Sequence, residues 1–501
     1  MQLEERLSFK QGENVDLKLS DPNRQMLHKG MLKKRESSSD TRGDTVQVFL
    51  FDHALLIVKV KVVSKREQYK VTRRPIPLEL LVVSTAEEPR GSLTKRPSSS
   101  LLPGTSKNGK LETTKADTGK SGGYSLVFTH LGRRGYTITL YAGTYVNRRK
   151  WIENISSQQR LLIEGSRVFV SVVTCEKYFM GGNRVNYGGR KLAYGTDTGI
   201  YVSDRKPHST TKSTPVRTLT LSNVAQMDIL EEYGLILVLS DKSLFSFPLE
   251  ALDPNDQTLA NKRPRKIAGH LNFFKVGVCL GRFLVCVVKS SVLSSTIKVF
   301  EPVDHVSKGK KQPAFRKLLQ GGTEMLKVFK EFYIPTESSS IHFLKTKLCV
   351  GCAKGFEVVS LENLETQSLL DPADTSLDFV QRRETVRPIA IYRMNGEFLV
   401  CYDEFAFFVN KNGWRARSDW IIHWEGMPSS FALNYPYILA FEPSFIEIHH
   451  LESGALSQVI PGNNITLLSD GRGKLGEGGE ILYGCENSEG ENQVHALMRH
   501  I

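Results

Sequence analysis

The stretch GEFLVCYDEFAFFVNKNGWRAR (396–417) places Cys401, Asp403 and Glu404 almost side by side inside an apolar run. A thiol beside two carboxylates raises the question of a catalytic cluster. The flanking apolar residues favour two antiparallel strands joined by a two-residue polar step, with Cys401 as a small buried hydrophobe. Because side chains alternate along a strand, Asp403 and Glu404 would face opposite ways instead of converging on a substrate. We therefore predict a hairpin here, a second turn at 410–413, and no catalytic residue.

The same plan recurs along the chain after residue 166: an apolar strand, a short polar or glycine step, and another apolar strand. It is seen again in LAYGTDTGIYV (192–202) and LCVGCAKGFEVV (348–359). A weak repeat of this kind is typical of a β-propeller, whose four-stranded blades take about 40–50 residues each, so the remaining part of the chain predicts roughly seven blades. A closed ring also protects the sheet edges that so many strands would otherwise expose.

Length and composition indicate a large soluble protein. The chain has 501 residues, of which 40% are hydrophobic and 24% are charged, values typical of globular domains. No stretch of about 18 apolar residues predicts a membrane span, and the charged start MQLEERLSFK does not resemble a signal peptide. Seven scattered cysteines suit a reducing compartment. We expect a cytoplasmic protein.

The positive charge is concentrated in the first third of the chain. Residues 1–165 carry 29 Lys and Arg against 17 Asp and Glu, whereas the rest carries 38 against 36. A basic module on a near-neutral body predicts an anionic partner for that module, either nucleic acid or an acidic membrane surface.

The first third predicts a strand meander closed by one helix. Strand patterns begin near Leu27, GRRG (132–135) predicts a hairpin turn, and a helix is expected to begin after Thr144 as its N-cap and to stop at Gly165. Trp151 is expected on its buried face, which also carries Ile155 and Leu162.

This arrangement resembles a pleckstrin homology domain over 26–165, where Trp151 of the final helix would pack onto the open barrel. The segments that follow resemble the citron homology domain, a seven-bladed propeller. A pleckstrin homology domain followed directly by a citron homology domain, with WRARSDWIIHWEGMPSSFAL (414–433), is similar to the C-terminal half of fungal Rho-type guanine nucleotide exchange factors. The citron-like segments are 191–204, 348–361, 398–413 and 436–454.

The resemblance implies a mainly β chain: a pleckstrin homology β-barrel with a C-terminal helix, then a seven-bladed β-propeller. Residues 1–25 would be a linker from an absent Dbl homology domain, 26–165 the pleckstrin homology domain with a disordered insertion at 84–123, and 166–501 the citron homology domain. Because the Dbl homology domain catalyses exchange in that family, we expect no enzyme activity from this chain.

In the pleckstrin homology family the first two strands and their loop carry the phosphoinositide headgroup. Four or five clustered cations give useful but salt-sensitive attraction, at about 1 kcal/mol each near an anionic leaflet. Gln47 in the second strand stands where tight binders of the family continue their basic motif, so weak attraction is expected, and a merely solvated basic face remains an alternative. The lipid candidates are Lys29, Lys33, Lys34, Arg35, Arg42, Lys59, Lys65 and Arg66.

Three of the four tryptophans fall within 414–424. Aromatic residues with arginine are typical of interface hot spots. Packing of one blade onto the next is the alternative explanation. The candidates for partner binding are Trp414, Arg415, Arg417 and Trp420.

Other motifs predict structure and not chemistry. Cys349 and Cys352 have CxxC spacing without a second pair, and 471–476 fits GxGxxG without a following helix. His449 and His450 have no carboxylate in the expected register, so no metal site and no cofactor are predicted.

The leading hypothesis is a monomeric regulatory module recruited to the plasma membrane, with weak attraction to anionic lipids and a Rho-family GTPase or its regulators as partner. An enzyme site in the propeller channel is one alternative. Nucleic-acid binding by the basic third is another, but that region offers few exposed aromatic platforms, so we expect no nucleic acid.

Overall fold

The computed structural model describes residues 3–9, 17–34, 45–63, 66–85, 124–178, 184–187, 191–204, 215–256, 258–303, 325–353, 355–383, 385–472 and 478–500. It divides into two compact units. The first comprises Met1–Val168 and is grouped with the short segment Gln458–Gly462; the second comprises Phe169–Ser457 and Asn463–Ile501. Most of the predicted insertion at 84–123, and the lipid candidates Arg35, Arg42 and Lys65, lie outside the described residues. Within these residues no helix is long and apolar enough to cross a bilayer.

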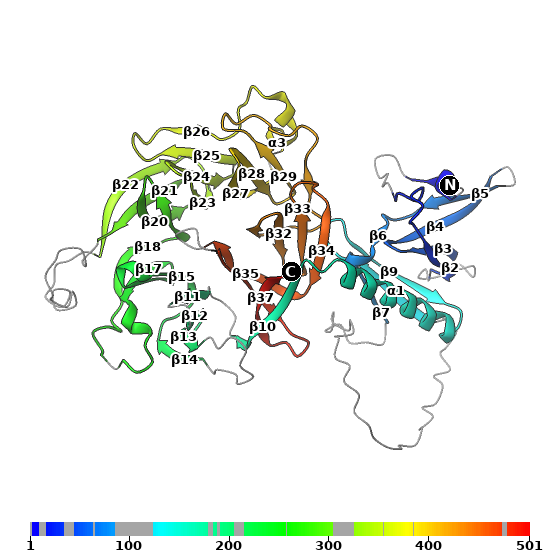
Figure 1. Ribbon diagram of the computed structural model, residues 1–501, viewed down its shortest axis with the longest axis horizontal. Helices are drawn as coiled ribbons and strands as arrows, with labels where there is room; N and C mark the ends of the chain where they lie inside the picture. Colours follow the sequence, from blue (N-terminus) through cyan, green and yellow to red (C-terminus); the bar gives the residue numbers. More distant parts are fainter. Residues whose placement is uncertain are drawn as a thin grey trace, which may run out of the picture. The chain divides into compact units, whose positions relative to one another are not determined.

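In its described part the first unit holds a nine-stranded sheet in the order β1-β5-β4-β3-β2-β9-β8-β7, with β6 paired to β4 (Figure 1). One long helix, α1 (Tyr145–Gly165), follows the last strand. The strands are β1 (Leu7–Ser8), β2 (Met26–Lys33), β3 (Thr45–Phe51), β4 (Ala54–Val63), β5 (Arg66–Val71), β6 (Ile76–Pro77), β7 (Leu81–Ser84), β8 (Tyr124–His130) and β9 (Tyr136–Ala142).

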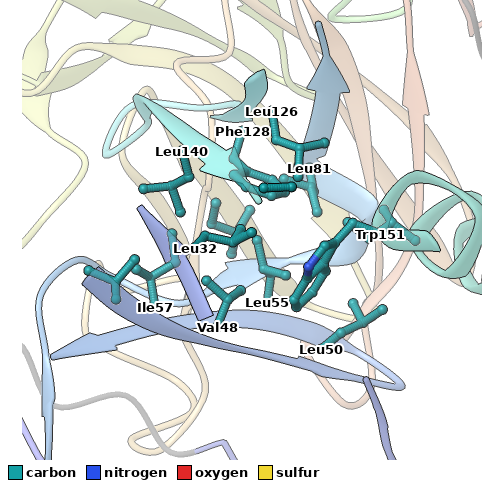
Figure 2. Packing of buried hydrophobic residues seen from close by; sticks show 14 of the residues in the cluster. Leu32, Val48, Leu50, Leu55, Ile57, Leu81, Leu126, Phe128, Leu140 and Trp151 are labelled. Atoms are coloured by element: carbon teal, nitrogen blue, oxygen red, sulfur yellow. The ribbon is translucent and has the colours of Figure 1, made fainter. Parts of the chain in front are cut away.

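Helix α1 begins and ends as its sequence predicts. The Oγ1 of Thr144 accepts a hydrogen bond from the backbone N–H of Asn147 at 3.1 Å, which satisfies one of the free amides of the first turn. Trp151 is fully buried, and a Cβ on Gly30 would lie 3.3 Å from its ring, so glycine leaves room for the indole. Figure 2 shows Trp151 beside Leu50 and Leu55 in the core.

The second unit is a ring of seven four-stranded antiparallel sheets within the described residues. Its first three sheets are β11 (Arg184–Tyr187), β12 (Lys191–Thr196), β13 (Gly199–Asp204) and β14 (Val216–Leu219); β15 (Val224–Leu230), β16 (Leu235–Ser240), β17 (Ser243–Pro248) and β18 (Arg265–Gly269); and β19 (Phe273–Cys279), β20 (Arg282–Ser290), β21 (Ser295–Pro302) and β22 (Leu326–Ile334).

The next three sheets are β23 (Ser338–Phe343), β24 (Lys347–Cys352), β25 (Gly355–Ser360) and β26 (Thr366–Ser368); β27 (Pro388–Met394), β28 (Glu397–Tyr402), β29 (Phe405–Val409) and β30 (Ile422–His423); and β31 (Ser430–Asn434), β32 (Tyr437–Glu442), β33 (Phe445–His450) and β34 (Leu456–Pro461). The last sheet joins β10 (Phe169–Tyr178) to β35 (Asn463–Arg472), β36 (Gly478–Glu486) and β37 (Asn492–Arg499).

The ring is closed by strands from both ends of the unit. Strand β10 pairs antiparallel with β37, from Phe169 opposite Arg499 to Tyr178 opposite Asn492. The first strand of the first sheet, β11, contacts β35 of the last. The blades pack face to face, and β16 is accordingly buried at every position, with apolar residues from Leu235 to Leu239. The predicted seven-bladed propeller is confirmed.

Connections between strands alternate between two faces of the ring. Because the first six sheets are antiparallel and in chain order, their turns joining second to third strands lie on one face, and those joining third to fourth strands lie on the other. This rule places the predicted hairpin turn at Asp403 and Glu404 on one face and the segment 410–421 on the opposite face.

Candidate functional site

Three basic residues of the first unit line one hollow. The hollow measures about 280 Å³ and is lined by Lys34, Val46, Lys59, Thr72, Arg73 and Ile138. Three cations around one hollow form an attractive site for a phosphate-bearing group.

Strand alternation divides the lipid candidates between the two faces of the sheet. Gly30 and Leu32 of β2 face the core beside Trp151, so Lys34 continues the inner face and lines the hollow. Lys29 and Lys33 have the opposite parity, are exposed and belong to the outer face.

Strand β4 follows the same rule. Leu55 and Ile57 lie in the core, and Lys59, two residues further on, lines the hollow. Arg66 is the first residue of β5. Of the predicted lipid candidates, Lys34 and Lys59 therefore lie together at the hollow.

Arg73 is a cation of the hollow that the sequence analysis missed. Its guanidinium carbon lies 5.5 Å from the ring centre of Tyr136, which holds the side chain at the rim. The signal in the sequence was the pair Arg73-Arg74 directly before Pro75, where β5 has already ended. Gln47, noted for interrupting the basic motif, instead donates to the carbonyl oxygen of Gly30 at 3.0 Å.

The tryptophan segment of the second unit separates into two groups. Trp414 is 44% exposed, and its Nε1 donates to Asp371 Oδ2 at 3.0 Å. Arg415 lies beside it: its backbone N–H donates to Asp374 Oδ2 at 2.7 Å, and its guanidinium lies 5.1 Å from the ring of Phe379.

Arg417 and Trp420 pack against their own sheet. The guanidinium of Arg417 lies 3.8 Å from the ring centre of Phe408 and forms an ion pair with Glu397 at 2.9 Å. Trp420 meets the same phenyl ring at 4.6 Å. Trp424, outside the candidate set, is buried against Phe431. Packing within its own sheet and near Gly454 of the next sheet accounts for Trp420, packing onto Phe431 of the next sheet accounts for Trp424, and Trp414 presents the exposed ring.

The hairpin that suggested a catalytic cluster is structural. Cys401 is fully buried in β28, and Asp403 and Glu404 form the two-residue turn to β29. Asp403 Oδ1 accepts from the backbone N–H of Arg387 at 2.9 Å, and Glu404 pairs with Arg383. The two carboxylates serve different ion pairs.

The expectation that His449 has no carboxylate partner was wrong. Its Nε2 lies 3.2 Å from Glu447 Oε2, two residues back on the same strand and the same face. Because residues i and i−2 of a strand share a face, the spacing of Glu447 and His449 in the sequence was the signal for this pair. Glu447 also accepts from the backbone N–H groups of Glu425 and Gly426, so its oxygens are occupied by protein donors. Among the described residues no cluster of three or more His, Cys, Asp or Glu could hold a metal ion.

The cysteines of the CxxC spacing lie in β24, with the turn after them. Both are buried, and burial raises the pKa of the Cys349 thiol far above its usual range. A protonated, inaccessible thiol has no redox chemistry to offer. Of the GxGxxG segment, 471–476, residues 473–476 lie outside the described residues.

The profile of the CNH domain family matches residues 188–471, most of the propeller. The chain belongs to the CNH domain family. The profile of a pleckstrin homology domain matches residues 26–159, ahead of the CNH domain. The solved structure titled "AfRom2 CNH domain" is 53% identical in sequence to this chain and superposes with a TM-score of 0.57. The match covers 66% of this chain and 100% of the solved chain.

Two fungal proteins align with nearly the whole chain. Rho1 guanine nucleotide exchange factor 1 of Schizosaccharomyces pombe is 55% identical over 98% of this chain and 37% of its own length. RHO1 GDP-GTP exchange protein 2 of Saccharomyces cerevisiae is 36% identical over 99% of this chain and 36% of its own. The chain thus spans less than half of each relative. The predicted resemblance to fungal Rho-type exchange factors is confirmed.

Proposed function

We propose that this chain is the regulatory and scaffolding part of a Rho guanine nucleotide exchange factor. Residues 26–165 target it from the cytoplasm to an anionic membrane surface, and the CNH domain, 166–501, docks a Rho-family GTPase or its regulators; residues 1–25 act as a linker. We assign exchange catalysis to neither part. One part matches the pleckstrin homology profile and the other the CNH profile, whereas the Dbl homology domain catalyses exchange in exchange factors of this type. Homology to Rho1 exchange factors supports the choice of GTPase.

The observation that carries the membrane role is the convergence of Lys34, Lys59 and Arg73 on one hollow. Each brings a positive charge and hydrogen-bond donors, so together they suit a phosphorylated headgroup. Three cations give an affinity that falls steeply with salt.

Co-sedimentation with vesicles tests this role. The wild-type chain is expected to bind phosphatidylcholine vesicles that contain phosphatidylserine or a phosphoinositide, and the triple variant Lys34→Glu, Lys59→Glu, Arg73→Glu to lose that binding. A matched control reverses three exposed propeller lysines, Lys242, Lys275 and Lys327. Equal loss in both variants would show that net charge, and not the hollow, attracts the membrane. Retention of vesicle binding by the triple variant would contradict the assignment.

A pull-down tests the platform role. The chain should capture a Rho1-type GTPase in at least one of three states: GDP-bound, bound to a non-hydrolysable GTP analogue, or nucleotide-free. Failure in all three states would contradict the GTPase as partner. Competition of vesicle binding by duplex DNA would instead favour nucleic acid as the ligand of the basic third.

A further inference from the structure

A second surface of the first unit joins two tyrosines and an arginine near the start of α1. The guanidinium carbon of Arg148 lies 5.4 Å from the ring centre of Tyr124 and 5.1 Å from that of Tyr145. The two rings meet edge to face at 5.8 Å. Both are solvent-accessible, at 37% and 52% exposure, and the neighbouring Val146 is 73% exposed. The cluster is therefore ordered by its own contacts while presenting apolar area to solvent.

The charge of this surface is positive. Arg149 and Lys150 follow Arg148 directly and are exposed, and the one acidic residue on this part of the helix, Glu153, is paired with Arg149 at 2.6 Å. The first turn of α1 contains no acidic residue. An anionic partner is favoured by this balance.

Strand register places the cluster close to the basic end of the sheet. Tyr141 of β9 pairs with Lys33 of β2 on one side and with Ser125 of β8 on the other. Lys33 is thus about two strand spacings, roughly 10 Å, from the backbone next to Tyr124. Tyr124 shares the parity of the core residues Leu126 and Phe128, so its ring and Lys33 lie on opposite faces of the sheet, and the cations that accompany the tyrosines are those of α1.

We propose that Tyr124, Tyr145, Val146 and Arg148 form an interfacial anchor that inserts into the headgroup region of an anionic bilayer. Tyrosine rings combine an apolar body with a polar tip and suit the membrane–water boundary, an exposed aliphatic side chain adds apolar burial, and the adjacent cations meet phosphate oxygens. The anchor rests on the membrane role proposed above but differs from the hollow, since its apolar part resists salt.

Salt titration of vesicle binding separates the two sites. The double variant Tyr124→Ser, Tyr145→Ser is expected to bind phosphatidylserine vesicles roughly tenfold more weakly at high salt, where the cations of the hollow are screened. The double variant Tyr124→Phe, Tyr145→Phe keeps both rings and should retain most of the binding, and an unchanged thermal unfolding midpoint of the serine variant shows that it is folded. Wild-type affinity in the serine variant would overturn the anchor alone. Failure of the wild-type chain to bind anionic vesicles would overturn both membrane proposals.

The depth of insertion supplies a second test. In Val146→Trp the indole should be quenched by brominated phosphatidylcholine in mixed anionic vesicles. The control is Leu161→Trp, which is 61% exposed on the same helix. It lies about 22 Å further along the axis and should not be quenched. Equal quenching at both positions would overturn the anchor, as would binding of the surface to soluble polyglutamate without any binding to vesicles.

Discussion

His449 and Glu447 form a buried pair in the sixth complete sheet of the CNH domain. His449 Nε2 lies 3.2 Å from Glu447 Oε2, and His449 Nδ1 lies 3.1 Å from the carbonyl oxygen of Gly454. Both ring nitrogens therefore face oxygen acceptors. The Glu447 carboxylate also accepts hydrogen bonds from the backbone N–H groups of Glu425 and Gly426, and these bonds fix the connection from β30 to β31.

Replacing Glu447 by Gln should destabilise the propeller by about 3 kcal/mol, because one buried carboxylate oxygen that receives N–H donors becomes an NH₂ group. Urea unfolding followed by tryptophan fluorescence measures the change, since the Trp424 ring lies 5.3 Å from that of His449. The control, Glu452→Gln, affects a surface carboxylate bonded to Tyr435. Equal midpoints for the two variants would contradict a structural role for the buried pair.

Two glycines of the fifth complete sheet provide a matched test of steric fit. Gly413 and Gly396 have similar positive φ angles, 83° and 88°. A Cβ on Gly413 would lie 2.2 Å from the carbonyl oxygen of Leu369, whereas a Cβ on Gly396 would meet nothing within 4 Å. Gly396→Ala should cost about 1 kcal/mol of unfolding free energy for the backbone alone, and Gly413→Ala at least about 3 kcal/mol. Thermal unfolding measures both variants. Similar losses of unfolding free energy would contradict an added cost from the clash with Leu369 and would leave backbone strain as the whole cause.

The first unit should lose stability in mild acid through His130. The side chain is buried, and burial, followed by the charge of Arg74, lowers its pKa to about 4 from 6.5. The unfolded chain therefore binds this proton more readily, so the stabilisation is complete above about pH 6.5 and declines as the pH falls towards 4, by about 3 kcal/mol.

Hydrogen exchange of peptides covering β8 and β9, measured between pH 7 and 4.5 and corrected for intrinsic exchange, follows this change. His130→Phe should flatten the pH dependence of the opening free energy. The exposed His270→Asn is the control. An unchanged slope in the phenylalanine variant would contradict His130 as the group responsible.

Trp414 should matter for binding and Trp424 for stability. Trp414→Ala removes an exposed ring tied to Asp371, so unfolding is expected to change by less than about 1 kcal/mol while capture of the partner weakens. Trp424→Ala opens the buried interface of two sheets at a cost of about 3–5 kcal/mol. Calorimetry and the GTPase pull-down, run on both variants, distinguish the effects. Full partner capture by Trp414→Ala would remove this residue from the binding surface.

Local sequence determined the elements of this protein. The Thr144 cap, the Gly165 stop, the turn at Asp403 and Glu404 and the repeated strand plan are fixed by neighbours in the chain, because capping, turn chemistry and alternation act over a few residues. The number of blades followed from the length of the repeat.

Tertiary structure decided which of these residues meet. The resemblance to pleckstrin homology domains grouped Lys29, Lys33, Lys34 and Lys59 with the other lipid candidates. Alternation instead sends Lys29 and Lys33 to the outer face, and Arg73 joins Lys34 and Lys59 from beyond β5. The sequence grouped the tryptophans by spacing, yet packing buried Trp424 and left Trp414 accessible. Burial and convergence depend on strands distant in sequence, such as β10 closing the ring against β37, and no local pattern carries that information.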